Sequence, residues 1–262
     1  MEEKIEAFRK LLEIMSELRA KCPWDQKQTV ESLRYLTIEE TYELSDAILE
    51  KDMTEVKKEL GDLMLHLVFY SKIGSETNSF TILDVLNNII EKLINRHPHI
   101  FGEVKVSTAK DVKDNWEKIK LKEKGNDSVL SGVPKSLPAI VKAFRIQEKA
   151  SGVGFDWEKP EQVWEKVLEE LNELKTEVSN GSSSDKKEDE LGDLLFAIVN
   201  YARFIDVNPE DALERTNRKF IQRFQYLEEK AKENSKPLNE MTLEEMDVFW
   251  NQAKMMNKYS PE

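Results

Sequence analysis

Carboxylate pairs at helical spacing are the residues of this chain best suited to do chemistry. In chain order the pairs are Glu40 with Glu43, Glu59 with Asp62, Glu170 with Glu173, and Glu190 with Asp193. Residues three apart are neighbours on a helix surface, so both acids of a pair share one face. Carboxylates that converge from two packed helices resist ionisation unless a cation binds among them. All-oxygen ligation selects a hard cation, so the pattern predicts Mg²⁺, with Mn²⁺ as a substitute, and suits phosphate binding and hydrolysis.

The acids occupy helix faces that otherwise carry core residues. In the first such helix the seam runs through Leu33, Leu36, Glu40, Glu43 and Ala47, in alternating steps of three and four. The alternative is solvated surface, because such pairs are common on helices of acidic proteins. Their repetition, their seam positions and a glycine inside each ELGD segment favour a metal site. No His occupies the fourth position of any pair, which argues against the Glu-x-x-His pattern of di-iron bundles.

The two ELGD segments place Gly61 and Gly192 inside predicted helices. A glycine in a helix interior costs about 1 kcal/mol relative to alanine. We therefore expect each glycine to mark a close backbone approach to the helix that carries the other acids. His66 follows Asp62 by one turn and lies among leucines, so we expect a packed histidine rather than a ligand.

The elements that must position these acids all have the apolar spacing of helices. The expected helices span residues 2–21, 30–50, 55–74, 80–97, 108–123, 139–150, 160–179, 186–206, 209–234 and 242–255. No alternating strand pattern is found. The predicted fold class is therefore all-α, built as helical bundles.

An internal repeat divides the chain in two. WDQKQT at 24–29 corresponds loosely to FDWEKP at 155–160, and EETYE at 39–43 corresponds to EELNE at 169–173. ELGDLMLHLVFYSKI at 59–73 corresponds to ELGDLLFAIVNYARF at 190–204. The offset stays near half the chain length, which indicates two copies of one unit. The Gly-, Ser- and Pro-containing stretch between them predicts domains at 1–123 and 139–262, joined by a linker at 124–138.

Composition limits the partners of the chain. Its 262 residues contain 51 Asp and Glu against 39 Lys and Arg, a net charge of −12. This acidity argues against a protein that grips a nucleic-acid polymer or an anionic membrane. The single cysteine, Cys22, cannot form an intramolecular disulfide, and no apolar run reaches the length of a membrane span. We expect a cytoplasmic location and an inert Cys22.

At the motifs CPWDQKQT (22–29), EETYE, ELGDL, VGFDW, EELNE and ELGDLLFAIVNYAR the sequence resembles the MazG family of nucleoside triphosphate pyrophosphohydrolases. The resemblance extends over essentially the whole chain. It implies two tandem all-α domains completed by a homodimer, and Mg²⁺-dependent hydrolysis of NTPs or dNTPs to the monophosphate and pyrophosphate, with water attacking the α-phosphorus. By position it also implies Mg²⁺ ligands in both copies. These are Glu170, Glu173, Glu190 and Asp193 in the second, and Glu40, Glu43, Glu59 and Asp62 in the first.

The two copies differ at positions that matter for a triphosphate. Asn200 follows Asp193 by seven residues, whereas Phe69 follows Asp62 by seven. The later segment TNRKFIQRF contains Lys219 and Arg223 at i,i+4 spacing, a pair suited to phosphate oxygens, whereas its first-copy counterpart INRHPHIF is interrupted by proline. Trp250 could stack on the base. We therefore expect the second domain to be the principal catalytic one.

Two alternatives to a broad nucleoside triphosphate pyrophosphohydrolase stay open. One is an enzyme of the same fold with narrow specificity for dUTP or dCTP. The other is a non-catalytic, dimeric helical interaction protein whose acids bind only metal or solvent. Asn200, Lys219 and Arg223, retained beside an intact acid set, argue against the second alternative.

Overall fold

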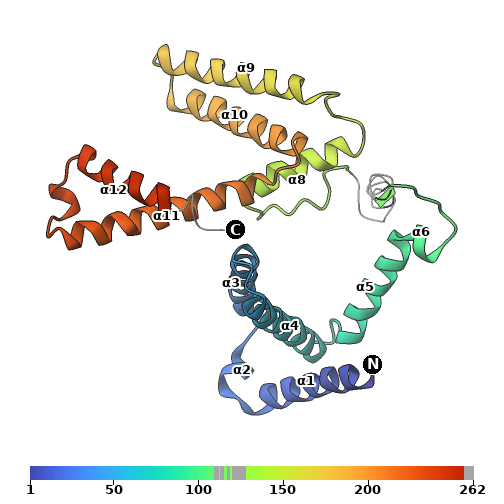
Figure 1. Cartoon of the computed structure of the whole chain (residues 1–262). Helices are drawn as coiled ribbons and strands as arrows, with labels where there is room; N and C mark the ends of the chain where they lie inside the picture. Colours follow the sequence, from blue (N-terminus) through green and yellow to red (C-terminus); the bar gives the residue numbers. More distant parts are fainter. Residues whose placement is uncertain (109–111, 113–114, 117–118, 120–127, 257–262) are drawn as a thin grey trace. The chain divides into compact units, whose positions relative to one another are not determined.

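The structure, a computed structural model, describes residues 1–108, 112, 115–116, 119 and 128–256 (Figure 1). Every regular element in these residues is a helix, and none is a strand. The predicted all-α class is thereby confirmed. Most of the helix expected at 108–123 and residues 124–127 of the expected linker lie outside the described residues. No helix within the described residues is both long and apolar enough to cross a membrane.

The chain forms two compact units, Met1–Ser107 and Thr108–Glu262. Each unit holds one set of the expected acids. The predicted boundaries at 123/124 and 138/139 stay a prediction, because much of the stretch that would test them is not described.

The first unit is built around a pair of packed helices. Its elements are α1 (Glu2–Lys21), α2 (Pro23–Lys27), α3 (Val30–Leu49), α4 (Met53–Glu76), α5 (Ile82–Arg96) and α6 (Pro98–Phe101). A capping box at Thr29, whose side chain accepts from the backbone N–H of Ser32, begins α3, and Asp52 caps α4. Helices α3 and α4 lie side by side (Figure 1). Their shared core with α1 consists of Met15, Leu33, Val68, Phe69 and Ile73.

The second unit repeats the packed pair with α9 and α10. Its elements are α8 (Ala139–Ser151), α9 (Pro160–Ser179), α10 (Ser184–Phe204), α11 (Pro209–Glu233), the 3₁₀ turn η1 (Leu238–Glu240) and α12 (Leu243–Met256). Helices α9 and α10 form a hairpin that turns at Gly181, whose φ is +66°. Helix α8 packs against α10, and α11 packs against α12. The hairpin core contains Val167, Leu194 and Ala197.

Three short helices were not expected: α2, α6 and η1. Helices α2 and α6 each begin with a proline, Pro23 and Pro98, at the first helical position, where the missing N–H costs nothing. Helices of four or five residues span little more than one turn, so they are too short to show a repeating apolar spacing. Pro98 thus ends the expected helix 80–97 at Arg96 and begins α6.

Several helices expose long apolar faces. Helix α5 buries none of its side chains, although apolar residues recur along one face. Those that are clearly exposed are Leu83, Val85, Leu86, Ile89, Ile90, Leu93 and Ile94. On the α9–α10 hairpin the exposed apolar residues include Leu168, Leu171, Leu191, Leu195 and Ile198. Contiguous apolar faces of this kind typically belong to interfaces.

Candidate metal centre

The acidic pairs of the second unit meet on facing helices. Glu170 lies on α9, and Glu190 and Asp193 lie on the first half of α10. One carboxylate oxygen from each lies within 4.8 Å of the other two. The hairpin core brings them together, because Val167 packs with Leu194 beside the acids. Three of the four expected acids therefore form a cluster that could hold a hard cation.

Glu173 lies outside this group of three but acts on it electrostatically. Burial raises the pKa of Glu190, and the charges of Glu173, Asp193 and Glu170 raise that pKa further. A raised carboxylate pKa means that the surroundings disfavour the ionised form, and a cation among the acids would relieve this. The charges of the cluster therefore fit a divalent cation.

Lys166 is a neighbour of the cluster that we did not expect. Its Nζ lies 2.6 Å from Oε1 of Glu170 and 2.7 Å from Oε1 of Glu169. Hydrogen bonds to Glu169 and Glu170 raise the pKa of Lys166. Glu170 is 6% exposed, and among the described residues this ammonium group forms an ion pair with it. The i,i+4 spacing of Lys166 and Glu170 is the signal that could have revealed the pair.

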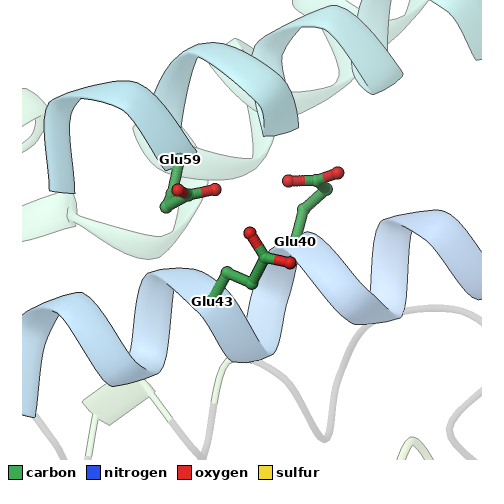
Figure 2. Close-up of side chains that lie close together, drawn as sticks. All are labelled: Glu40, Glu43 and Glu59. Atoms are coloured by element: carbon green, nitrogen blue, oxygen red, sulfur yellow. The ribbon is translucent and has the colours of Figure 1, made fainter. Parts of the chain in front are cut away.

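The first unit contains a matching cluster. Figure 2 shows Glu40 and Glu43 on one helix turned towards Glu59 on the next, and one carboxylate oxygen from each lies within 4.8 Å of the others. Glu59 is 2% exposed, and its Oε1 accepts from Nζ of Lys58 at 2.9 Å. Its Oε2 is buried and has no hydrogen-bond partner among the described residues. An orphaned buried carboxylate oxygen is what a cation site offers before the cation binds.

Asp62 and His66 complete the surroundings of this first cluster. Burial raises the pKa of Glu40, and Asp62 contributes to the shift together with Glu43 and Glu59. His66 is 7% exposed, and burial lowers its pKa despite the opposing charge of Asp62. The histidine is thus packed, as expected.

A cavity of about 840 Å³ opens beside the acids of the second unit. We call it the α8–α10 cavity. Its lining includes Glu170 and Asp193, the amides Gln147 and Asn200, and the rings of Phe155, Phe196 and Trp157. Ligand sites of small molecules typically measure roughly 300–1,000 Å³ and combine apolar walls with a few polar groups. The cavity therefore has the size and lining for a nucleoside-sized ligand adjacent to a charged cluster.

Asn200 is held in this cavity by two further residues. Its Oδ1 accepts from Nε and Nη2 of Arg203, at 3.2 and 2.9 Å. Arg203 also binds Asp156, with Nη1 2.8 Å from Oδ2. Burial opposes ionisation of Asp156, but the hydrogen bonds from Arg203 and Ser151 outweigh it and lower the pKa of that carboxyl. Nothing in the sequence indicated a role for Arg203. Asp156 does lie in a repeated segment, FDWEKP at 155–160.

The first unit treats the matching position differently. Phe69, seven residues after Asp62 as Asn200 is after Asp193, is 2% exposed and belongs to the core with Met15. The ring of Phe69 also lies under the guanidinium of Arg19, 5.6 Å from the ring centroid. The second unit thus presents an amide to a cavity where the first presents a ring to its core.

Lys219, Arg223 and Trp250 gather elsewhere in the second unit. The guanidinium carbon of Arg223 lies 5.7 Å from the ring centroid of Trp250, and Phe220 packs on that ring at 5.0 Å. Lys219 is exposed on the same helix. Unlike Asn200, these three predicted substrate residues do not line the α8–α10 cavity. The structure therefore brings Asn200 to the acids but does not bring this cationic group to them, and its role stays a prediction.

The expected role of the two helical glycines is wrong for this chain. A Cβ built on Gly61 or on Gly192 would meet no neighbouring atom within 4 Å. Both residues are exposed, and the helix pairs meet through other positions, such as Leu33, Val68 and Leu194. Neither glycine therefore marks a close backbone approach to any of the residues that the structure describes.

The chain is similar in sequence to known proteins. A family model described as the MazG nucleotide pyrophosphohydrolase domain matches the chain twice, over residues 28–101 and 158–227. Each match contains one complete set of four expected acids. The chain belongs to the MazG family.

Relatives of this MazG chain are similar over nearly its whole length. The nucleoside triphosphate pyrophosphohydrolase/pyrophosphatase MazG of Thermotoga maritima is 46% identical, over 94% of this chain and 95% of the relative. The nucleoside triphosphate pyrophosphohydrolase of Escherichia coli is 39% identical, over 94% and 96%. The crystal structure of a MazG-related protein from Thermotoga maritima covers 44% of this chain and 99% of its own, at 26% identity and a TM-score of 0.39.

The structure, the family match and the two relatives confirm three expectations. The described residues form an all-α fold, and the chain carries two tandem MazG copies. Its enzyme class is that of the nucleoside triphosphate pyrophosphohydrolases, which are hydrolases of phosphoric anhydrides. The ligand set, the metal and the dimer are proposals.

Proposed function

We propose that the second unit hydrolyses nucleoside and deoxynucleoside triphosphates to the monophosphate and pyrophosphate. The observation that carries this proposal is the α8–α10 cavity, which is lined at once by rings, by amides and by two members of the acidic cluster. A triphosphate needs a metal next to its phosphates and a mostly apolar slot for its base. Both features occur in one cavity here.

Glu170, Glu173, Glu190 and Asp193 are the residues that would hold Mg²⁺, or Mn²⁺ in its place. A divalent cation bound there supplies neutralisation of the phosphates and a lower pKa for a bound water. One carboxylate of the set orients and deprotonates the water that attacks the α-phosphorus in line, and pyrophosphate leaves. Phe155 and Trp157, which line the cavity, would supply ring surface against the base. From a second copy of the chain, Lys219 and Arg223 would hold the β- and γ-phosphates, and Trp250 would stack on the nucleotide.

We also propose that the chain works as a homodimer. The support is the exposed apolar face of α5 and that of the α9–α10 hairpin, which a single chain leaves in water. A second copy that covers such faces would also be able to bring Lys219 and Arg223 of one chain to the acids of the other. This would complete a site that one chain leaves open.

The first unit contributes in another way. It keeps an acid cluster able to hold a cation, but Phe69 belongs to the core where the second unit has Asn200 in a cavity wall. We therefore assign principal activity to the second unit and weak activity, regulation or dimer contacts to the first.

The test is pyrophosphate release with Mg²⁺ over the eight common NTPs and dNTPs. We expect release from most of the panel, at least a hundredfold lower rates in Glu173→Ala, and a smaller change in the matched variant Glu43→Ala. If Glu43→Ala abolishes turnover and Glu173→Ala leaves it intact, the assignment to the second unit is wrong. Activity on only dUTP or dCTP would indicate an enzyme of narrow specificity. No pyrophosphate release from any nucleotide of the panel would indicate a non-catalytic interaction protein. Hydrolysis in ¹⁸O-water should place the label in the monophosphate, since label in pyrophosphate alone excludes attack at the α-phosphorus.

A further inference from the structure

Arg203 is the centre of a polar network in the wall of the α8–α10 cavity. Its side chain is 16% exposed, and its Nη1 donates to Oδ2 of Asp156 at 2.8 Å. Its Nη2 donates to Oδ1 of Asp156, and Nε and Nη2 donate to Oδ1 of Asn200 at 3.2 and 2.9 Å. These bonds engage all but one of the N–H groups of the guanidinium, and the carboxylate of Asp156 balances its charge.

Asp156 stands between two aromatic residues of the cavity wall, and we call Phe155–Trp157 the aromatic segment. Both rings line the cavity, although Phe155 is 83% and Trp157 46% exposed. The carboxylate of Asp156 also accepts from the backbone N–H of Trp157 at 2.9 Å, which couples the carboxylate to the backbone of the segment. The middle residue of the segment is therefore bound, while the rings on either side of it are open to a ligand.

The aromatic segment passes from α8 to α9, and Asp156 ties it to α10. At the start of the segment a backbone N–H donates to the carbonyl of Ala150 on α8, at 3.1 Å. Just after its end, two backbone N–H groups donate to Oε1 of Gln162 on α9, both at 3.1 Å. The bonds from Asp156 to Arg203 cross to α10, the helix that carries Asp193. This ion pair therefore sets where the rings stand relative to that helix and its acids.

The first unit holds the corresponding segment with an arginine from another helix. Arg19 on α1 donates to the backbone carbonyl of Asp25, which lies in WDQKQT, and its Nε donates to Oε1 of Glu76 on α4 at 3.2 Å. Its guanidinium carbon also lies 5.6 Å from the ring centroid of Phe69, the counterpart of Asn200. Two copies that make the same link with different residues favour a role for the link itself.

We propose that Arg203 is a positioning residue for the nucleotide: by holding Asp156, it places the rings of the aromatic segment against the base. The inference rests on the proposed function, since it needs a nucleotide in the α8–α10 cavity. Arg203 itself binds no phosphate, because its N–H groups are engaged and its charge is balanced by Asp156. Loss of Arg203 should therefore weaken binding of the base and leave the hydrolytic step, which depends on the acids, unchanged.

The first test separates KM from kcat for pyrophosphate release from ATP with Mg²⁺. In Arg203→Met, with folding verified by circular dichroism, we expect KM to rise roughly tenfold, the size of one lost base–ring contact, at a nearly unchanged kcat. A purely structural role would lower the folded fraction, and hence kcat, at constant KM. That result, or an unchanged KM and kcat, would overturn the inference.

Two further variants complete this comparison. Arg203→Lys keeps the charge and part of the link, so its KM should lie between those of the wild-type chain and Arg203→Met. Arg215→Met is the matched control, because Arg215 is exposed and donates to the backbone carbonyl of Asp211 on its own helix. It should keep the wild-type KM, and a KM raised as in Arg203→Met would contradict a specific role for Arg203.

A probe without a base distinguishes positioning of the base from binding of phosphate. Inorganic tripolyphosphate with Mg²⁺ competes with ATP for the acids but offers nothing to the aromatic segment. Its inhibition constant should therefore be the same in the wild-type chain and in Arg203→Met. A rise as large as the rise in KM for ATP would mean that Arg203 binds phosphate, and would refute the positioning role.

A double-mutant cycle tests whether Arg203 acts through the rings. Phe155→Ala combined with Trp157→Ala removes both rings and should itself raise KM for ATP. Adding Arg203→Met to this background should then change KM little, whereas independent effects that multiply would contradict the inference. If the wild-type chain hydrolyses no triphosphate, the proposed function fails, and calorimetric dissociation constants for AMP decide about Arg203. Roughly tenfold weaker binding in Arg203→Met would support the positioning role, and equal affinity would overturn it.

Discussion

Lys166 shows how one side chain can stabilise a cluster of acids in the absence of a cation. Glu170 is nearly buried among acids, and burying a carboxylate without a partner is costly. The ammonium group of Lys166 contacts Glu170 and Glu169 and offsets part of that cost. Because Lys166 is 38% exposed, water screens the pair and limits its contribution. A cation would take over this role when it binds.

Replacement of Lys166 should therefore matter most without metal. We expect Lys166→Met to lower the free energy of unfolding of the metal-free chain by about 1 kcal/mol, because Glu170 loses its partner. Urea titrations with and without Mg²⁺ would measure this, and the loss should shrink with Mg²⁺ because the cation replaces the ammonium group. Lys175→Met, an exposed lysine on the same helix, is the control and should change little. A loss that grows on addition of Mg²⁺ would contradict this account.

Asp156 predicts a pH dependence of stability. Its pKa is lowered in the folded chain, so its contribution is present above the ordinary aspartate pKa and is lost as pH falls through the folded value. We expect Asp156→Asn to cost about 1 kcal/mol near pH 7, because the charged partner of Arg203 is removed. The thermal unfolding temperatures of the wild-type chain and of Asp156→Asn should approach each other as the pH falls below about 4. Asp189→Asn, on the exposed side of α10, should show no such convergence.

Spacing along one helix could be read from the sequence, whereas pairing across the fold could not. The two acids of each pair are three residues apart, and any helix brings residues at this spacing to one face. The internal repeat shows the same pairs in both copies. Gln147 and Phe196, or Asp156 and Arg203, are separated by more than forty positions and meet only because α8 and its following loop pack on α10. Gln147 and Arg203 therefore carried no local signal. The second group, Lys219, Arg223 and Trp250, shows the opposite limit. The two cations suit phosphates and the ring suits a base, but none of the three lines the cavity beside the acids.

At the scale of elements, the α9–α10 hairpin is what sets the distance between the acids. Its turn depends on Gly181, which has a φ of +66° that other residues adopt only with strain. Its helices were predictable from periodicity to within two residues at each end, because they are long and amphipathic. The short helices α2 and α6 were not predictable from periodicity. Each begins with a proline and is too short to have an apolar stripe of its own.

Two glycines of this hairpin should respond to alanine in opposite directions. Gly181→Ala should lower the free energy of unfolding by about 1–2 kcal/mol, because the added Cβ meets open space but the left-handed backbone is strained. Gly192→Ala should raise it by about 1 kcal/mol, because the residue is helical and a Cβ there contacts nothing. Urea unfolding measures both changes. A destabilised Gly192→Ala would mean that another chain covers this face.

The dimer is the prediction that belongs to the whole molecule. If the apolar face of α5 is an interface, Ile90→Glu places a charge in it and should shift the chain towards monomer by at least tenfold in dissociation constant. Asn88→Glu adds the same charge on the polar face of α5 and should leave the dimer intact. Light scattering coupled to gel filtration distinguishes the two. A wild-type chain that is monomeric at micromolar concentration would contradict the proposed assembly.

Phe69 has a consequence for how such a tandem chain can evolve. Because a ring fills the core at this position, an amide there would remove a large buried side chain, at about 3–5 kcal/mol for loss of the ring, and would leave a polar group unpaired. A typical domain is stable by only about 5–15 kcal/mol, so this single substitution would consume much of that margin. The first unit thus uses this position for stability, whereas the second presents an amide there to a cavity. A change from Phe69 to an amide by one substitution would therefore pass through a strongly destabilised chain.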